Sequence, residues 1–204
     1  MNKRCVYQLP PEAPRLLPVP DWQELTPINL RHTLEFQVSL IVGDRLQLQE
    51  AAIRYFRTIQ TWFPVVSETR YNAQLASLRV KMDAAPADFS LLTLCMALVC
   101  KEPTARGIPV SARSQYTSLK GFVTHLEAMG ANSLEIIQSR VLLTIFEIGH
   151  AIYPSAYISA AANIRAAISL GIGSLREDPH TVLGDLENAT EAQKVWCAIL
   201  IIDR

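Results

Sequence analysis

The stretch between Ser133 and Leu170 is the sequence feature that most constrains the fold. Apolar residues recur there every three or four positions, which is the period of an α-helix. The pattern is interrupted once, at Tyr153-Pro154, where proline lacks the backbone donor that a helix needs. The stretch therefore predicts two consecutive amphipathic helices with a tight break between them.

Helix start and stop signals recur along the rest of the chain, and no segment shows a strand or hairpin pattern. We predict an all-α fold, an irregular bundle of about seven or eight helices, in one domain over residues 23–204. Residues 1–22 carry five prolines and are predicted to be a linker. The expected helices run from Pro27 to Gly43, Asp44 to Trp62, Ser67 to Leu78, Pro86 to Cys100, Ser111 to Met129, Ser133 to Ile148, Pro154 to Leu170, and from a capping box at Thr190…Gln193, after a loop over residues 173–189.

Half of the residues are hydrophobic and only 19% are charged, so the chain is more apolar than a typical soluble domain. Two compatible interpretations stay open: several helices are fully buried, or exposed faces pack on chain outside this sequence. The run from Phe89 to Cys100 is apolar all round and indicates a central core helix. It is too short to cross a bilayer, so we expect no membrane segment.

The formal net charge is zero and the basic residues are scattered singly. A domain that binds nucleic acid by its phosphates usually carries a basic face, so we expect this stretch not to be the part that contacts DNA, and any direct binding to be weak and non-specific. The four cysteines, Cys5, Cys95, Cys100 and Cys197, form no C-x-x-C pair and have no histidine at zinc spacing. We therefore predict no metal ligands and no cofactor in this chain.

No catalytic motif is present. The Gly171-Ile172-Gly173 sequence begins like a dinucleotide-binding loop, but Arg176 stands at the third glycine position and a helix precedes it. We therefore expect no catalytic residues and no enzymatic activity.

Three charges, Glu147, Arg165 and Asp203, are embedded in apolar runs. An unpaired buried charge is strongly destabilising, so we expect these side chains to have partners, and pairing with one another is one option. Structural ion pairing and contact with a small effector stay open as alternatives. His150, near the end of its helix, is either a capping or packed residue or a ligand and pH sensor.

An aromatic cluster of Phe56, Trp62 and Phe63 precedes Pro64. Such clusters belong more often to a core than to a binding site, so we expect these three rings to be buried.

The order of these motifs resembles the middle regulatory region of fungal zinc-cluster transcription factors. The resemblance covers residues 21–204 and no single motif is decisive. It rests on the aromatic turn Trp62-Phe63-Pro64, the apolar helix Leu91 to Val99, the Ser133 to Gln138 motif, the Ala160 to Ile172 helix with its terminal Gly-Ile, and the closing Lys194-Val195-Trp196 to Asp203-Arg204. Two departures stand out: Gly173-Ser174 replaces the family's His-Arg, and Trp196-Cys197 replaces its Trp-Trp.

The resemblance implies a nuclear regulator of transcription by RNA polymerase II. In that family a cluster of six cysteines holding two zinc ions contacts DNA, and this chain lacks it. Cys5 is either the orphaned last ligand of such a cluster or an incidental thiol. The family's helical region continues beyond Asp203-Arg204, so we expect the regulatory domain to be incomplete at its C-terminus.

The resemblance also implies partners. These are DNA only through the missing cluster, proteins or a second copy through apolar helix faces, and a small-molecule effector, without a membrane. Trp196 joins the effector or structural candidates because it belongs to the closing motif. The alternative hypothesis is a helical partner-binding or scaffold protein that has no role in transcription.

Overall fold

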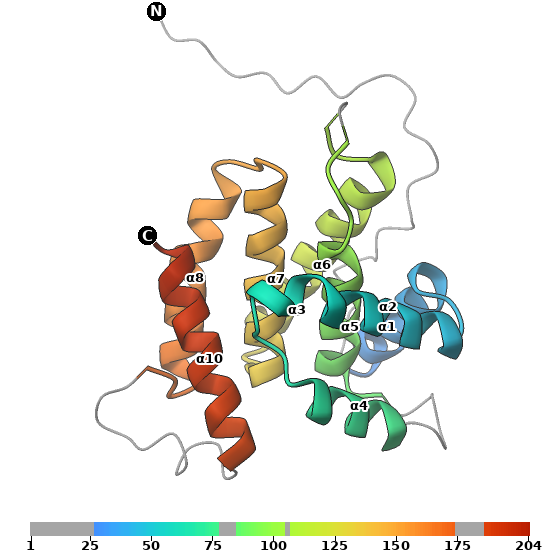
Figure 1. Cartoon of the computed structure of the whole chain (residues 1–204), viewed down its shortest axis with the longest axis horizontal. Coiled ribbons are helices and arrows are strands. Elements are labelled where there is room, and N and C mark those ends of the chain that lie inside the picture. The colour runs from blue at the N-terminus through green and yellow to red at the C-terminus, as the bar shows by residue number, and fades with distance from the viewer. Residues whose placement is uncertain (1–26, 78–84, 105–106, 174–185) are drawn as a thin grey trace, which may run out of the picture.

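The computed structural model describes residues 27–77, 85–104, 107–173 and 186–204, and their regular structure is helical (Figure 1). Over these ranges the chain forms eight helices of ten to nineteen residues, one four-residue helix and no strand, which confirms the all-α prediction. The linker over residues 1–22, Cys5 included, lies outside the described residues. The helices are α1 (Pro27–Ile41), α2 (Arg45–Arg57), α3 (Ile59–Trp62), α4 (Glu68–Ser77), α5 (Ala87–Val99), α6 (Val110–Ala128), α7 (Leu134–Gly149), α8 (Ser155–Ser169) and α10 (Leu186–Ile202).

Helix α7 is the centre of the bundle. It contacts α5, α6, α8 and α10, and Figure 1 shows it standing between α5 and α6 on one side and α8 and α10 on the other. Its residues from Ile136 to Thr144 are all buried. Four polar residues of this run, Gln138, Ser139, Arg140 and Thr144, therefore lie in the interior and need partners there.

Helix α5 is the second buried helix, and α1 and α2 pack against it. Every residue from Phe89 to Val99 except Ala97 is buried. The prediction of a core helix that is apolar on all sides is therefore confirmed.

Local capping places α7 relative to α5. Ser133 Oγ accepts a hydrogen bond from the backbone N–H of Ile136, at 3.2 Å, as an N-cap residue does. The same hydroxyl donates to Asp88 Oδ2 at 3.0 Å, and Asp88 belongs to the first turn of α5. One serine thus starts α7 and also ties its first turn to the neighbouring helix.

Two helix boundaries differ from the sequence-based prediction. The helix expected from Asp44 to Trp62 is broken at Thr58, whose hydroxyl bonds to the Arg54 carbonyl oxygen at 2.7 Å. Threonine bonding back to its own helix often bends it, which explains the break. The last helix begins at Leu186 rather than with a capping box at Thr190, because burial of Ala189 continues the apolar period upstream.

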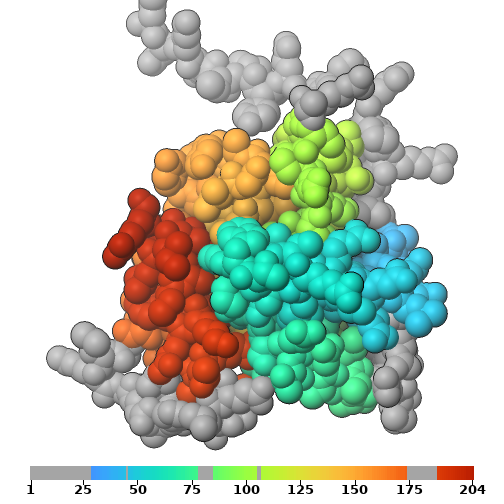
Figure 2. Space-filling view, in the orientation of Figure 1, coloured from blue at the N-terminus to red at the C-terminus, as the bar shows by residue number. Residues whose placement is uncertain are grey.

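The segment over residues 45–77 crosses the face of the molecule seen in Figure 2, between α1 and α10. Phe56 and Phe63 are buried as predicted. Trp62 is 60% exposed, so the prediction was wrong for this ring. It lies at the end of α3, where the chain turns at Pro64, and this turn directs Phe63 inward and leaves Trp62 outside.

Candidate functional site

Glu147 is completely buried, as its place in an apolar run suggested, and its partners come from α6. Glu147 Oε1 accepts hydrogen bonds from the Tyr116 hydroxyl at 2.7 Å and from Lys120 Nζ at 2.9 Å. Lys120 Nζ also donates to Ser159 Oγ on α8 at 2.5 Å. Lys120 therefore connects α6 both to the Glu147 carboxylate on α7 and to α8. Burial and the hydrogen bond to Glu147 raise the pKa of Tyr116 well above its usual value.

Arg165 and Asp203 lie apart from Glu147, so the option that the three embedded charges pair with one another is wrong. Both are exposed, and neither contacts Glu147. On α8 the inward face carries Ala160, Asn163 and Ala167, so helical geometry turns Arg165 outward. Asp203 follows the end of α10 and is open to solvent.

His150 occupies the C-cap of α7. Its Nδ1 lies 3.0 Å from the Phe146 carbonyl oxygen, and its ring packs on the Phe146 ring with centroids 3.9 Å apart. His150 Nε2 is buried without a hydrogen-bond partner. The bond to the carbonyl requires a proton on Nδ1, so Nε2 is an acceptor in the neutral ring.

Trp196 is half-buried on α10 and packs over Gly173. Gly173 has φ = +81°, and a Cβ built on it would lie 2.5 Å from the indole ring. This position therefore requires glycine for two reasons, its backbone conformation and the close approach of the ring. Trp196 fixes the chain that leaves α8 against the last helix.

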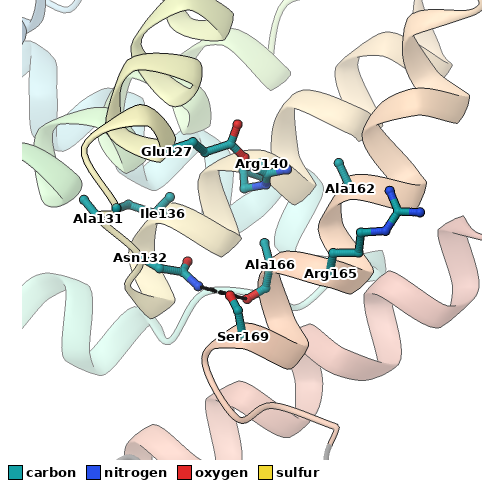
Figure 3. Close-up of a pocket in the computed structure, with 10 residues that line it drawn as sticks. Glu127, Ala131, Asn132, Ile136, Arg140, Ala162, Arg165, Ala166 and Ser169 are labelled. Carbon is teal, nitrogen blue, oxygen red and sulfur yellow. Dashed lines mark hydrogen bonds and ion pairs between the residues drawn. The ribbon is translucent and has the colours of Figure 1, made fainter.

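A pocket of about 400 Å³ opens between the α6–α7 connection, α7 and α8 (Figure 3). Its walls are mainly small or apolar, and its polar groups come from five side chains. Ligand pockets in proteins usually combine such walls with a few polar groups, and their volumes start at about 300 Å³. The lining comprises Ala131, Ile136, Ala162 and Ala166 with Glu127, Asn132, Arg140, Arg165, Ser169 and Gly130.

Arg140 is the buried cation of this pocket and is only 8% exposed. Its Nε donates to Asn163 Oδ1 at 3.3 Å, and Asn163 Nδ2 donates in turn to Thr144 Oγ1 at 2.9 Å. The Thr144 hydroxyl donates to the Arg140 carbonyl oxygen at 2.9 Å. This closed network between α7 and α8 holds the guanidinium group in place.

The counter-ion of Arg140 is Glu127, from the last turn of α6. The Glu127 side chain is 47% exposed, whereas Arg140 is almost fully enclosed. Burial lowers the pKa of Arg140, but a guanidinium group stays charged at neutral pH. The two members of the pair therefore differ in exposure. Arg140 is buried and held by its hydrogen bonds, whereas Glu127 lies at the surface in contact with solvent.

Arg165 also borders the pocket, but its charged end does not point toward Arg140. In Figure 3 its side chain extends along α8, away from the guanidinium group of Arg140 and from the α6–α7 connection. On the opposite wall, Asn132 Nδ2 donates to the Ala166 carbonyl oxygen at 2.9 Å and to Ser169 Oγ at 2.8 Å. The pocket thus has one buried cation, on α7, and an amide group that joins the α6–α7 connection to α8.

A second polar cluster centres on Glu191 of α10, which is 4% exposed. Its Oε1 accepts hydrogen bonds from the Ser67 backbone N–H and from Gln138 Nε2, both at 2.6 Å. Arg70 Nη1 lies 2.9 Å from Glu191 Oε2, and Arg70 also pairs with Glu135 of α7. The cluster joins the last helix to α4 and α7 and so stabilises the bundle.

The sequence-based prediction missed Arg140 and Glu127, although a signal for them was present. Lys120 and Glu127 lie seven residues apart on α6, and Arg140 and Glu147 lie seven apart on α7. Consecutive antiparallel helices bring such pairs together in opposite order, and the opposite charges match.

No three His, Cys, Asp or Glu side chains come together in a way that could hold a metal ion within the ranges the structure describes. Cys95, Cys100 and Cys197 are free thiols, and burial raises the pKa of Cys95. Among the described residues, no helix has both the length and the apolar character needed to cross a membrane.

The chain is similar to the transcription factor BOA15 of Botryotinia fuckeliana. The two are 32% identical over 126 residues, which cover 61% of this chain and 67% of the relative. No protein-family model matches the chain. No solved structure matches it either.

Proposed function

Because the chain belongs to the family of the transcription factor BOA15, we propose that it is the regulatory region of a fungal transcription factor. In this proposal it modulates transcription by RNA polymerase II and acts in the nucleus. The observation that carries the proposal is the 32% identity with a transcription factor over 126 residues. The all-helical bundle agrees with it, because the resemblance in sequence motifs implied a helical regulatory region.

Contact with DNA is assigned in this proposal to a zinc cluster outside the 204 residues. The formal net charge of zero supports the assignment, since binding to phosphates needs an excess of basic side chains. The region itself would act by binding rather than by catalysis. Purified alone, it should bind DNA weakly, without sequence preference and with strong sensitivity to salt.

An input and an output are both needed for regulation, and the structure offers a candidate for each. The pocket beside Arg140 is the candidate input site for a small effector. For the output, Tyr157 and Ile158 on α8 and Ile201 on the neighbouring α10 are exposed apolar side chains. Exposed apolar groups of this kind favour contact with protein partners or with a second copy.

Fusion to a heterologous DNA-binding domain tests the proposal. We expect the fusion to raise or lower a reporter gene that carries the cognate sites, relative to the DNA-binding domain alone. Ile158→Lys and Ile201→Lys in the same fusion should reduce the effect without unfolding the protein, because both side chains are exposed. A folded, nuclear fusion that leaves the reporter unchanged contradicts the proposal and favours the scaffold alternative.

A further inference from the structure

We propose that the pocket between α6, α7 and α8 binds a small organic carboxylate, whose anionic group takes the place of Glu127 on Arg140. Glu127 already shows the chemistry that the site accepts, because its carboxylate pairs with the buried guanidinium group. The proposal names the ligand class of the effector site and rests on the proposed function only for its biological role.

The difference in exposure between Arg140 and Glu127 favours exchange of the anion rather than of the cation. Arg140 is enclosed and anchored through Asn163, so moving it would break a buried network. Glu127 is nearly half exposed, so its carboxylate can turn into water and stay solvated, but the buried guanidinium group is then left without a counter-ion. Once Glu127 leaves, the buried cation needs another anion, and a ligand carboxylate supplies one.

The walls of the pocket determine which kind of carboxylate fits. Ala131, Ile136, Ala162 and Ala166 give an apolar surface around the volume of about 400 Å³. Such walls favour a carboxylate with an apolar body over a compact, strongly hydrated anion. Figure 3 shows that the pocket provides one guanidinium group near Glu127, which suits a single carboxylate.

The position of Glu127 connects ligand binding to the rest of the molecule. Its ion pair joins α6 to α7, as does the ion pair of Lys120 with Glu147. A ligand carboxylate would replace the first pair and leave the second intact. Binding would therefore loosen the C-terminal turn of α6 from α7 without dismantling the bundle.

NMR titration of the isotope-labelled 22.7 kDa chain tests this directly. The probes are benzoate, phenylacetate and octanoate, with benzamide, phenylacetamide and octanamide as neutral counterparts and inorganic phosphate as an anion without an apolar body. We expect at least one acid to shift the backbone resonances of residues 131–136 and 162–169. Its amide should bind about tenfold more weakly or not at all, because the charge-assisted contact is lost.

Three variants assign the binding to this pocket. Glu127→Gln should tighten acid binding about fivefold, because the competing carboxylate is removed. Ala162→Leu should abolish it by filling the pocket. Arg113→Gln, at an exposed position of α6 outside the pocket lining, is the matched control and should leave the affinity within about twofold.

Several results would overturn the inference. These are no shift with any acid, equal binding of an acid and its amide, equal binding of phosphate, weaker binding after Glu127→Gln, or binding that survives Ala162→Leu. Loss of acid binding in Arg113→Gln would also overturn it, since binding would then depend on a cation outside the pocket. An active reporter fusion without acid binding contradicts only this inference, and acid binding with an inactive fusion contradicts only the proposed function.

Discussion

The two charges buried in α7 are each balanced by a side chain of opposite charge on α6. Glu147 pairs with Lys120, and Arg140 pairs with Glu127. The exposure of the partners differs from that of the buried members: the Lys120 side chain is 36% exposed and Glu147 is not exposed at all. Removing the α6 member of either pair leaves an uncompensated ion in the core. Removing the buried member on α7 does not, because its α6 partner reaches solvent.

Lys120→Met should reduce the free energy of unfolding by about 3 kcal/mol, because the buried Glu147 carboxylate keeps only the Tyr116 hydroxyl as partner. The double variant Lys120→Met, Glu147→Gln should recover most of this loss. Urea unfolding measures both. Lys194→Met, at an exposed position of α10, is the matched control and should change the value by less than about 0.5 kcal/mol. An equally small change in Lys120→Met would contradict the prediction.

Tyr71 gives a prediction about alkaline pH. Its ring is buried against Phe89, its hydroxyl bonds with Thr93, and burial raises its pKa to about 12. Because the folded pKa lies above the unfolded value of about 10, the stability is intact below pH 10 and falls as the pH rises toward 12. Between pH 7 and 11 the wild type should lose about 1.4 kcal/mol more than Tyr71→Phe.

Urea unfolding at several pH values compares the two proteins. At pH 7 Tyr71→Phe should be the less stable one by about 1 kcal/mol, because the hydrogen bond to Thr93 is lost. Parallel pH profiles for the two proteins would show that Tyr71 does not titrate on unfolding.

At the scale of elements, the connection after α8 depends on glycine conformation and on packing against another helix. Gly171, at φ = +81°, ends α8, and its N–H bonds to the Ile168 carbonyl oxygen at 2.9 Å. Ile172 is then buried, and Gly173 lies under the Trp196 ring. The helix stop is a local property, whereas the need for glycine at the second position comes from α10.

Gly173→Ala should destabilise the protein by about 2–4 kcal/mol, through backbone strain of about 1–2 kcal/mol and overlap with the indole ring. Gly107→Ala is the matched control, because Gly107 has φ = +92° and open space around it. The free energy of unfolding of Gly107→Ala should fall only by the backbone strain of about 1–2 kcal/mol. Thermal and urea unfolding of the two variants give the difference, and equal losses would show that Trp196 does not restrict this position.

At the scale of the whole molecule, segments far apart in the sequence are joined by polar contacts as well as by the core. Glu191 binds Ser67 and Gln138, so α10 is fixed to the turn before α4 and to the central helix. Figure 1 shows α10 at one side of the bundle, with α4 at the foot of the same face. A carboxylate at 4% exposure with three partners holds this arrangement together.

Glu191→Ala should reduce the free energy of unfolding by about 3 kcal/mol, because the buried donors of Gln138 and Ser67 lose their acceptor. Hydrogen exchange should show α10 opening more readily than α7. Glu102→Ala, at an exposed position, is the matched control and should have an effect below about 0.5 kcal/mol. Unchanged exchange in α10 would mean that apolar packing alone holds this helix.

Most of the helices and their buried faces could be predicted from local sequence patterns. The apolar period, the serine cap at Ser133 and the glycine stops act over a few residues, so they are legible without a fold. The start of the last helix at Leu186 was missed because a capping pattern at Thr190 competed with a weak apolar period. Whether each embedded charge is buried or exposed could not be predicted either, because an apolar run contains both inward-facing and outward-facing positions.

Which charges pair, and where space remains between the helices, depends on how the helices pack. Glu147 pairs with Lys120 because α6 packs on α7, whereas Arg165 and Asp203 are exposed to solvent. The pocket beside Arg140 likewise exists only where three helices diverge. Periodicity is a property of neighbours along the chain, but pairing and cavities depend on how whole helices pack, and no short stretch of sequence encodes that.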